Sequence, residues 1–370
     1  QINIKTYGNN EISFYVDEIK DVFRLLSISL TENLYADLLL IKQATNYGSL
    51  ILPKTGSKEI ETTVEQLTQK AKSADIFLSP KIDSLLVALN QLLTLAQKYH
   101  CVVANPPYMG DSKYNKSLAE YINLNYKESR LDLMTCFMES GINLTLSFGF
   151  LGMINQHSWM FISSYKGLRR KLLESISFNS MLHLGTRTFS EIGGEVVQNT
   201  AFSLQNATRE NNITLYIRLV DYDSSEKKRE ATKDIIKNHI NQIFFVNQND
   251  FKLIPNYNIC YWYSDRVIKN FKNLSIGDIS ITKAGIVSGN DSIYLKIWHE
   301  INYQEISLNT ERFHISNNIK YSPISKGGGV RKFFGNMDYV INLGRLWDES
   351  IINKSVRRGD PNYYFNEGIT

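Results

Sequence analysis

Apolar residues recur along the first part of the chain at two spacings, one typical of helices and one typical of short buried strands. The clearest helix is predicted from about Lys81 to Lys98, where apolar residues follow each other every three or four positions. The run Cys101–Ala104 comes directly after it, and its β-branched character is typical of a buried parallel strand. Mixed helical sequence over 11–45 precedes both, so helices and a strand are expected to follow one another.

The same alternation continues further along the chain. Two more helices are predicted at 131–146 and 164–175, and strand-like apolar runs occupy 148–154, 180–184 and 200–204. Strands that alternate with helices predict an α/β fold with a mainly parallel sheet. Because ligands bind beyond the carboxyl ends of the strands in such sheets, we expect any chemistry just after Ala104 or Ile154.

Two stretches near the start of the chain are less regular. The apolar run Tyr47–Pro53 contains a glycine and ends at a proline, which predicts either a strand or a loop at a strand end. Residues 54–64 are polar and are expected to be exposed.

The texture of the sequence changes from about Asn206. A charged stretch over 224–230 predicts a surface segment or the start of a helix, and short runs rich in Asn, Tyr and Ile follow it. We therefore expect a first domain over 1–210 and, over 211–370, a linker and the start of a second domain of mixed α/β or β-rich character.

The composition is that of an ordinary globular protein. Apolar residues make up 43% and charged residues 21%, and the net charge of +4 permits nucleic-acid binding without arguing for it. Three separated cysteines, Cys101, Cys136 and Cys260, support neither a zinc site nor a disulfide framework and fit a reducing cytoplasm. No run approaches the ~20 apolar residues of a membrane span. The chain starts with Gln and has no leader-like segment, so we expect a piece of a larger protein.

The tetrapeptide Asn105-Pro106-Pro107-Tyr108 follows the predicted strand directly. Two prolines stiffen the backbone, so the Pro106 carbonyl and the Asn105 side-chain oxygen become two rigid acceptors. Such a pair suits an amino group with two N–H donors, such as N6 of adenine, and leaves the nitrogen lone pair free to attack a methyl group in line. Tyr108 offers a flat face for the base, which must leave the duplex to reach it. The alternative is a stiffened strand exit without function, but the position after a hydrophobic strand favours the chemical interpretation.

This tetrapeptide is the signature of methyltransferases that act on the amino group of adenine in DNA. Its surroundings resemble the PglX methyltransferases of BREX phage-exclusion systems, and the likeness covers nearly all of residues 100–370. It is carried by Val102–Gly110, Gly152–Phe161, His183–Gly185, Glu191–Gln198, Tyr261-Trp262, Gly285–Asp291, Lys326–Gly329 and Glu367–Thr370. Before residue 100 the likeness is looser, at Gly48–Ile51.

The resemblance implies a Rossmann-like methyltransferase domain over 1–210, with S-adenosylmethionine as the methyl donor. It implies that 211–370 include the start of a target-recognition domain for double-stranded DNA. It also implies adenine-N6 methylation in phage defence or restriction-modification, with other proteins of such a defence system as partners. The setting would be the cytoplasm, with no part for a membrane.

One expected feature of the family is missing ahead of residue 105. Such enzymes carry a glycine-rich cofactor loop after their first strand, and no such loop precedes Asn105. The glycines of Ser147–Gly152 open another strand, whereas phosphate or methionine cradles want a helix start behind the glycines. We therefore expect the main cofactor loop upstream of Gln1. No metal site is expected.

Several residues near the second strand end are candidates for contact with the substrate. Trp159 and Phe161 could pack against an extruded base, or could be ordinary core residues. A basic cluster on a predicted helix contains Lys166, Arg169, Arg170 and Lys171, and it predicts either phosphate contacts or a solvated helix face.

The second domain has basic candidates of its own. Lys283 begins a glycine-containing segment, and Lys326, Arg331 and Lys332 flank a triple glycine where the backbone can approach a phosphate. Each alone is more typical of an ordinary surface. Together, in the second domain of such a family, they favour DNA contact.

Two other functions fit the same residues. The tetrapeptide also occurs in methyltransferases that act on RNA adenine or on protein glutamine, where a planar amine or amide is likewise held. Without its cofactor loop, the chain could also be a recognition module that binds DNA without independent catalysis. The long second domain with basic and aromatic residues favours DNA as the substrate.

Overall fold

The computed structural model describes residues 16–189, 197–238, 242–281, 283, 285–308, 320–326, 330, 335–349 and 363. The chain divides into two compact units, Gln1–Asn273 and Leu274–Thr370. Each unit has buried apolar residues of its own. Among the described residues, no helix combines the length and the apolar character needed to cross a membrane.

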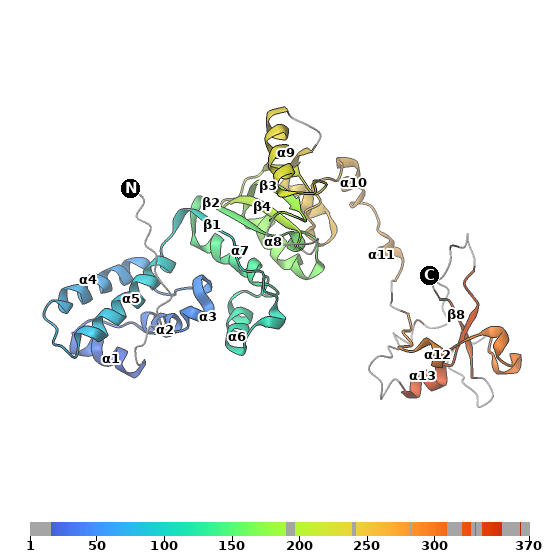
Figure 1. Ribbon diagram of the computed structural model, residues 1–370, viewed down its shortest axis with the longest axis horizontal. Helices are drawn as coiled ribbons and strands as arrows, with labels where there is room; N and C mark the ends of the chain where they lie inside the picture. Colours follow the sequence, from blue (N-terminus) through green and yellow to red (C-terminus); the bar gives the residue numbers. More distant parts are fainter. Residues whose placement is uncertain are drawn as a thin grey trace. The chain divides into compact units, whose positions relative to one another are not determined.

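The first unit begins with a group of helices (Figure 1). They are α1 (Val16–Leu25), α2 (Glu32–Ile41), α3 (Ala44–Tyr47), α4 (Ser57–Ala71) and α5 (Ser79–Ala96). Their leucine and isoleucine side chains form one core with α6 (Lys116–Asn125) and the start of α7 (Leu133–Leu144). The hydroxyls of Tyr121 and Tyr126 both donate to the Leu50 carbonyl, at 3.1 and 2.7 Å, which joins this helical group to α6.

Two expectations for this region hold only in part, since most of residues 54–64 are exposed but do not form a loop, and 47–53 contains no strand. The run 47–53 is the end of α3, a 3-10 turn (Gly48–Leu50) and a loop rather than a strand, because Gly48 leaves the helix with a positive φ of 54°. The polar stretch after it contains α4, which buries a narrow stripe of Ile60, Thr63 and Leu67. So few apolar positions are easily taken for an exposed loop.

A six-stranded sheet follows, and the α/β fold class is confirmed. Its strands are β1 (Tyr99–Ala104), β2 (Thr145–Gln156), β3 (Ser177–Gly185), β4 (Asn199–Gln205), β5 (Ile213–Arg218) and β6 (Ile243–Asn247), in the order β1-β2-β4-β3-β5-β6. β1 and β2 are parallel, as are β3 and β5, but the other three neighbouring pairs are antiparallel. The sheet is therefore mixed rather than mainly parallel, because β4 runs backwards between β2 and β3.

Helices cover the two faces of the sheet differently. α7 and α8 (Lys166–Ser175) pack on one face, against Leu151, Met153 and Met181. α9 (Ser225–Asn238) packs on the other face, against Leu182 and Ile217 of the central strands. Since β5 and β6 belong to this sheet, the first unit continues past the boundary expected near residue 210.

β1 is a strand, as predicted, but it is less buried than its sequence suggests. Within the described residues it pairs with β2 alone and so lies at an edge of the sheet. Cys101 is exposed and Val103 is 78% exposed. A β-branched run indicates a strand but not how many neighbours the strand has.

The second unit is a small mixed α/β structure. Strands β7 (Leu295–Ile297), β8 (Ser322–Ile324) and β9 (Tyr339–Ile341) form an antiparallel sheet in the order β7-β9-β8. Its core joins α12 (Asp291–Tyr294) and α13 (Leu343–Glu349) through Tyr294, Leu343 and Leu346. The second unit also contains α11 (Ile276–Ile279) and 3-10 turns at Trp298–Glu300 and Tyr303–Glu305.

The described part of the first unit has one more helix, α10 (Asp265–Asn270). Its other 3-10 turns lie at Asp111–Lys113, His157–Met160, Ser163–Tyr165, Gln248–Leu253 and Pro255–Tyr257.

Candidate functional site

The tetrapeptide Asn105–Tyr108 lies at the carboxyl end of β1, where the sequence pattern placed the chemistry. Ala104, the last residue of β1, is opposite Met153 of the parallel strand β2. Asn105 and Pro107 are exposed, Pro106 is buried and Tyr108 is half-buried. The side-chain oxygen of Asn105 is therefore accessible beside a backbone fixed by a buried proline.

Asp132 holds the backbone that follows the tetrapeptide. Its carboxylate accepts hydrogen bonds from the Met109 and Met134 amides, at 3.2 and 2.9 Å, and it caps the start of α7. The Leu133 amide donates to the Met109 carbonyl at 3.0 Å, so the two segments are bonded in both directions. Sequence reasoning missed Asp132, although an Asp before an apolar helical run is a signal for a helix cap.

The hydroxyl groups of Tyr108 and Tyr114 point into the protein. Both oxygens are buried and have no hydrogen-bond partner among the described residues. Burial, with a smaller contribution from the Asp132 charge, raises the pKa of Tyr108, and burial likewise raises the pKa of Tyr114. Burial also raises the pKa of Asp132 itself, although two amides bond to it. The tyrosine hydroxyls are therefore neutral at physiological pH.

A chain of hydrogen bonds runs through the residues after β2 and at the end of β3. Nδ1 of His157 lies 2.8 Å from Nε2 of His183, and Nδ1 of His183 lies 2.9 Å from the Tyr261 hydroxyl. His183 and Tyr261 are buried, whereas His157 is half-buried. Burial lowers the pKa of His157, and burial together with His157 and Arg218 lowers the pKa of His183 to about 3. Both imidazoles are thus held neutral.

Aromatic rings surround this chain. Phe161 meets His157 edge-on at 5.4 Å between ring centroids and lies 5.6 Å from Trp262. The Arg218 guanidinium lies over the Trp262 ring, 5.5 Å from its centroid. Phe161 and Trp262 are partly exposed, so the predicted Phe161 belongs to a half-open aromatic cluster. No role for His183, Tyr261 or Arg218 was read from the sequence, because their contact brings together three distant segments.

Two residues proposed as substrate contacts are core residues instead. Trp159 is 0% exposed, packs against Phe178 and Phe202, and donates its indole N–H to Asn155 at 3.0 Å. Arg169 is also fully buried, and its guanidinium donates to the carbonyls of Trp159, Ile162 and Asn256. With four of its five N–H groups bonded and no exposed surface, this guanidinium is not accessible to a phosphate. The spacing of basic residues in the sequence could not predict the buried carbonyl groups that accept the hydrogen bonds of Arg169.

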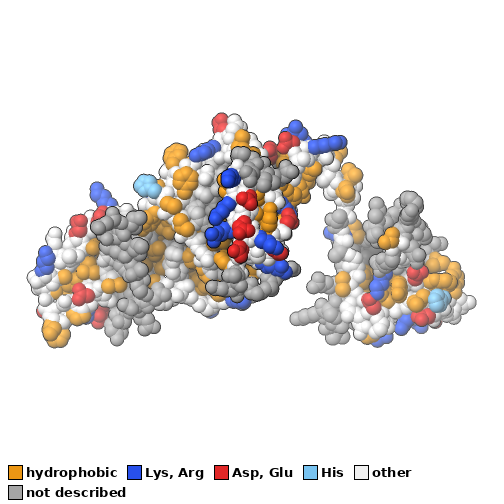
Figure 2. All heavy atoms as spheres, turned by 45° about the horizontal axis from the view of Figure 1, so that its top comes forward, with side chains coloured by type: hydrophobic (Ala, Val, Ile, Leu, Met, Phe, Trp, Pro, Cys, Tyr) orange, Lys and Arg blue, Asp and Glu red, His pale blue; other side chains and the backbone are white. Residues whose placement is uncertain are grey.

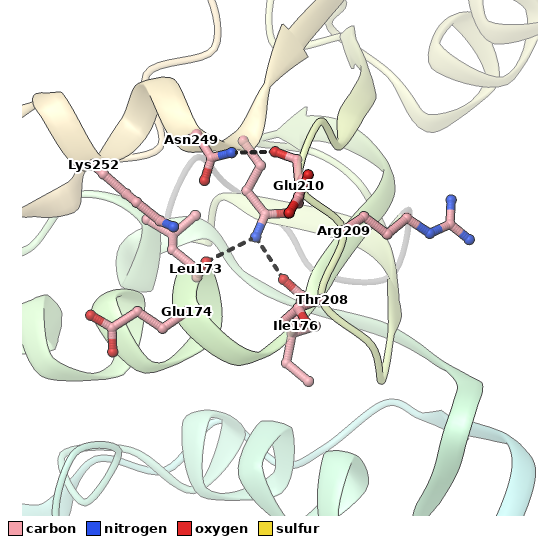
Figure 3. A pocket seen from close by; sticks show the side chains of 9 residues that line it. Leu173, Glu174, Ile176, Thr208, Arg209, Glu210, Asn249 and Lys252 are labelled. Carbon is pink, nitrogen blue, oxygen red and sulfur yellow. Dashed lines mark hydrogen bonds between the residues drawn. The ribbon is translucent and has the colours of Figure 1, made fainter.

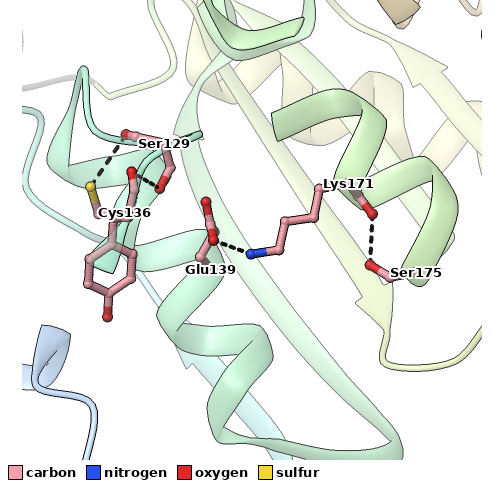
Figure 4. Close-up of polar contacts among 6 residues, drawn as sticks. Ser129, Cys136, Glu139, Lys171 and Ser175 are labelled. Atoms are coloured by element: carbon pink, nitrogen blue, oxygen red, sulfur yellow. Dashed lines mark hydrogen bonds and ion pairs between the residues drawn. The ribbon is translucent and has the colours of Figure 1, made fainter. Parts of the chain in front are cut away.

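The other basic residues of α8 point outward. Lys166 and Arg170 are exposed. Lys171, beside them, reaches across to α7 and pairs with the carboxylate of Glu139, as Figure 4 shows. Of the predicted basic cluster on α8, Lys166 and Arg170 therefore keep a side chain available at the surface.

The basic candidates of the second unit take part in local contacts. Lys326 pairs with Asp291 and lies over the Tyr339 ring at 5.3 Å from its centroid. Lys283 lies over the ring of Tyr363, at 4.7 Å. Arg331 and Lys332 lie outside the described residues. Contact of Lys326 with a phosphate would have to compete with its carboxylate partner.

Neither the distribution of surface charge nor the arrangement of possible metal ligands points to a particular ligand. On the face drawn in Figure 2, acidic and basic side chains are interspersed rather than gathered into one basic patch. Within the described ranges, no group of three or more His, Cys, Asp or Glu side chains could hold a metal ion.

A cavity of about 350 Å³ lies at the opposite edge of the sheet, by the amino end of β3 (Figure 3). Its walls are lined by Leu173, Glu174, Ile176, Thr208, Arg209, Glu210, Gln248, Asn249 and Lys252. Gln248 fills its bonding capacity against the Leu173 and Ile176 carbonyls, the Phe178 amide and Asn212. The cavity lies away from the tetrapeptide and has the bonded walls of a structural junction.

The described residues do not fit a cofactor loop. Gly149 and Gly152 lie inside β2, with a strand rather than a helix after them. A side chain at Gly149 would meet the His100 carbonyl at 2.8 Å, so this glycine serves the close approach of β1 and β2.

Comparisons with known proteins found one matching family and two curated relatives. The Eco57I restriction-modification methylase family matches residues 19–189. The adenine-specific methyltransferase PglX of Lacticaseibacillus casei (strain Zhang) is 38% identical over 286 residues, which cover 75% of this chain and 24% of that protein. The adenine-specific methyltransferase BrxX of Escherichia coli O9:H4 (strain HS) is 36% identical over 334 residues, which cover 90% of this chain and 27% of that protein.

Solved structures are more distant. The methyltransferase subunit of the type I restriction-modification system from Streptococcus thermophilus overlaps with a TM-score of 0.34 and 14% identity, covering 48% of this chain and 45% of that one. Such a low similarity carries no argument about function. The two sequence matches span about a quarter of the length of each curated relative. The resemblance read from the sequence is thus confirmed, and the chain is a relative of the PglX and BrxX adenine-specific methyltransferases.

Proposed function

We propose that the chain is the part of a DNA adenine-N6 methyltransferase that grips the target adenine. The observation that carries this proposal is the corner Asn105–Tyr108, which leaves β1 at the carboxyl edge of the sheet and is held there by Asp132. The relatives are adenine-specific methyltransferases, and S-adenosylmethionine bound by the whole protein would supply the methyl group. The enzyme would work in the cytoplasm, in phage defence or restriction-modification.

The residues of the corner divide the work. The Asn105 side-chain oxygen and the Pro106 carbonyl accept the two N6 hydrogens of adenine, so the nitrogen lone pair faces the methyl group. S-adenosylmethionine would supply a methyl group that passes to N6 as its own carbon–sulfur bond breaks, with S-adenosylhomocysteine leaving and one N6 proton lost to solvent. Tyr108 stacks on the base with its ring, while its hydroxyl oxygen lies buried in the protein. Pro107 limits the motion of the acceptors.

The remaining parts would bring the DNA to the corner. Phe161 lies at the same edge of the sheet, and Lys166 and Arg170 are exposed on α8. We assign them to contacts with the extruded nucleotide and its phosphates. The second unit, with Lys283 and Lys326, would start the target-recognition domain for double-stranded DNA. Other proteins of the defence system are its expected partners.

The test substitutes Asn105 in the full-length protein. Asn105→Ala removes one of two acceptors and should lower methyl transfer to duplex DNA by about 100-fold or more, because the amino group is no longer held in line. DNA binding, measured by a gel shift, should stay within about twofold of wild type, since phosphate contacts dominate affinity. Asn179→Ala is the matched control, because Asn179 is exposed near the amino end of β3.

Three substrates are compared in the same assay. Radiolabelled methyl should enter duplex DNA rather than RNA or protein. Near-normal transfer by Asn105→Ala would refute the role of the corner. Transfer to RNA or protein alone would replace DNA as the substrate, and DNA binding without transfer by the wild-type protein would favour a recognition module.

A further inference from the structure

The bonded chain His157–His183–Tyr261 fixes where each imidazole carries its proton. Arg218 can only donate, and its positive charge acts on the oxygen of the Tyr261 hydroxyl. The Tyr261 proton then points to Nδ1 of His183, at 2.9 Å. With Nδ1 accepting, neutral His183 carries its proton on Nε2 and donates it to Nδ1 of His157, at 2.8 Å. His157 therefore keeps its own proton on Nε2.

This proton faces away from the chain of bonds. Nε2 of His157 has no hydrogen-bond partner within the part of the chain that the structure describes, and the residue is half-buried. Phe161 packs edge-on against the ring and holds its orientation. His157 thus presents one N–H group in a fixed direction.

The N–H group lies at the edge of the sheet that carries the tetrapeptide. β1 and β2 are neighbouring parallel strands with Ala104 opposite Met153, so Asn105 and His157 leave the same edge from adjacent strands. The backbone N–H of His157 also donates to the Gln198 carbonyl at 2.9 Å, which places the residue between the end of β2 and the start of β4.

We propose that Nε2–H of His157 donates to an unprotonated ring nitrogen of the target purine, and so helps the site to select adenine in the orientation that the tetrapeptide needs. The proposal rests on the proposed function and adds to the tetrapeptide a residue that follows the neighbouring strand. His183 and Tyr261 act as positioning residues, because they set the tautomer of His157 without touching the base.

An uncharged acceptor suits this donor better than a phosphate does. Burial lowers the pKa of His157, so the ring stays neutral at physiological pH. The charged groups around the chain are Arg218, which faces Tyr261 and Trp262, and Asp221, which lies near Tyr261. The positive charge of Arg218 already disfavours a second positive charge on the imidazoles.

The experiment uses the full-length protein and duplexes in which the target adenine is replaced by 1-deaza-, 3-deaza- or 7-deazaadenine. His157→Leu should lower kcat/KM on adenine by about 10-fold to 100-fold, the usual loss for one buried hydrogen bond. His157→Gln, whose amide N–H reaches a similar position, should restore most of the loss. His100→Leu, an exposed histidine early in β1, is the control and should stay at wild-type rate.

The analogues separate recognition from structure. One of them should lower the wild-type rate by about the same factor and show no further loss with His157→Leu, because its acceptor nitrogen is gone. Tyr261→Phe should give a smaller loss with the same dependence on the analogue. An equal His157→Leu penalty on adenine and on all three analogues would overturn the proposal, as would no penalty at all. Failure of the proposed function looks different, since the wild-type protein would then methylate no adenine.

Discussion

At the scale of single residues, the corner depends on a side chain that never touches the base. Asp132 receives the Met109 amide just after Tyr108 and the Met134 amide at the start of α7. The tetrapeptide is stiff within itself because of its prolines, but its direction in the molecule is set by this carboxylate. The tetrapeptide motif therefore supplies the two acceptors, but the residue that fixes their direction, Asp132, lies outside the motif.

Asp132→Asn and Asp132→Ala should separate charge from hydrogen bonding. Asn keeps an acceptor for the two amides, and because burial raises the pKa of Asp132, removing the charge should leave the thermal unfolding midpoint equal or slightly higher. Ala loses the cap, at about 1 kcal/mol, and frees the corner, so methyl transfer should fall by about 10-fold or more. Calorimetry and the transfer assay check this, and an Ala variant as active as the Asn variant would contradict it.

At the scale of elements, Gly149 lies where the register between β1 and β2 shifts near the start of β1. Gly149 lies against the His100 carbonyl, and its place could not be filled by a side chain, whereas Gly152 on the same strand has room. Adjacent strands must lie at the regular spacing for Ala104 to come opposite Met153. The first glycine therefore keeps the register that carries Asn105 and His157 to one edge.

Gly149→Ala and Gly152→Ala form a matched pair for this claim. The first adds a methyl group 2.8 Å from both the His100 carbonyl and the Thr145 side chain, and should lower the free energy of unfolding by about 1–3 kcal/mol. The second meets its nearest atom, on Val103, at 3.8 Å, and should cost well under half as much. Urea unfolding of both variants decides the matter, and equal losses would speak against a special role of Gly149.

The helices and strands also show which features of the fold a sequence pattern can predict and which it cannot. Helices α5, α7 and α8 and strands β2 and β3 lie close to their predicted ranges, since their apolar spacing is strong. The direction of β4 and the edge position of β1 were missed, because side-chain alternation is the same in both directions. For the site, the tetrapeptide was found as a motif, whereas the burial of Trp159 and Arg169 depends on partners far along the chain.

At the scale of the whole molecule, the buried histidine couples the site to the stability of the first unit. The fold lowers the pKa of His183 from 6.5 to about 3, mainly by burial. Below pH 6.5 the His183 imidazole binds a proton in the unfolded chain but stays neutral in the folded chain. Stability contributed by the neutral form is therefore complete above this pH and is lost as the pH falls towards 3.

Acid should therefore weaken the wild-type protein more than a variant without this group. His183→Gln should be less stable at neutral pH, but the wild-type protein should lose about 2 kcal/mol more of unfolding free energy than the variant between about pH 7 and pH 5. Denaturant titrations at the two pH values give this difference. Parallel losses in both proteins would show that His183 titrates normally in the fold.

The uncovered side of β1 has a consequence for whatever polypeptide comes next to it. At this edge of the sheet the backbone amides and carbonyls of β1 have no partner strand among the described residues, and the Val103 side chain is exposed. An extended segment that paired with this edge of β1 would run beside Asn105. Its register would be set by the regular spacing of the backbone hydrogen bonds. A register shift of one residue would turn every side chain of the added strand to the opposite face of the sheet. A segment that pairs with β1 therefore has few allowed registers.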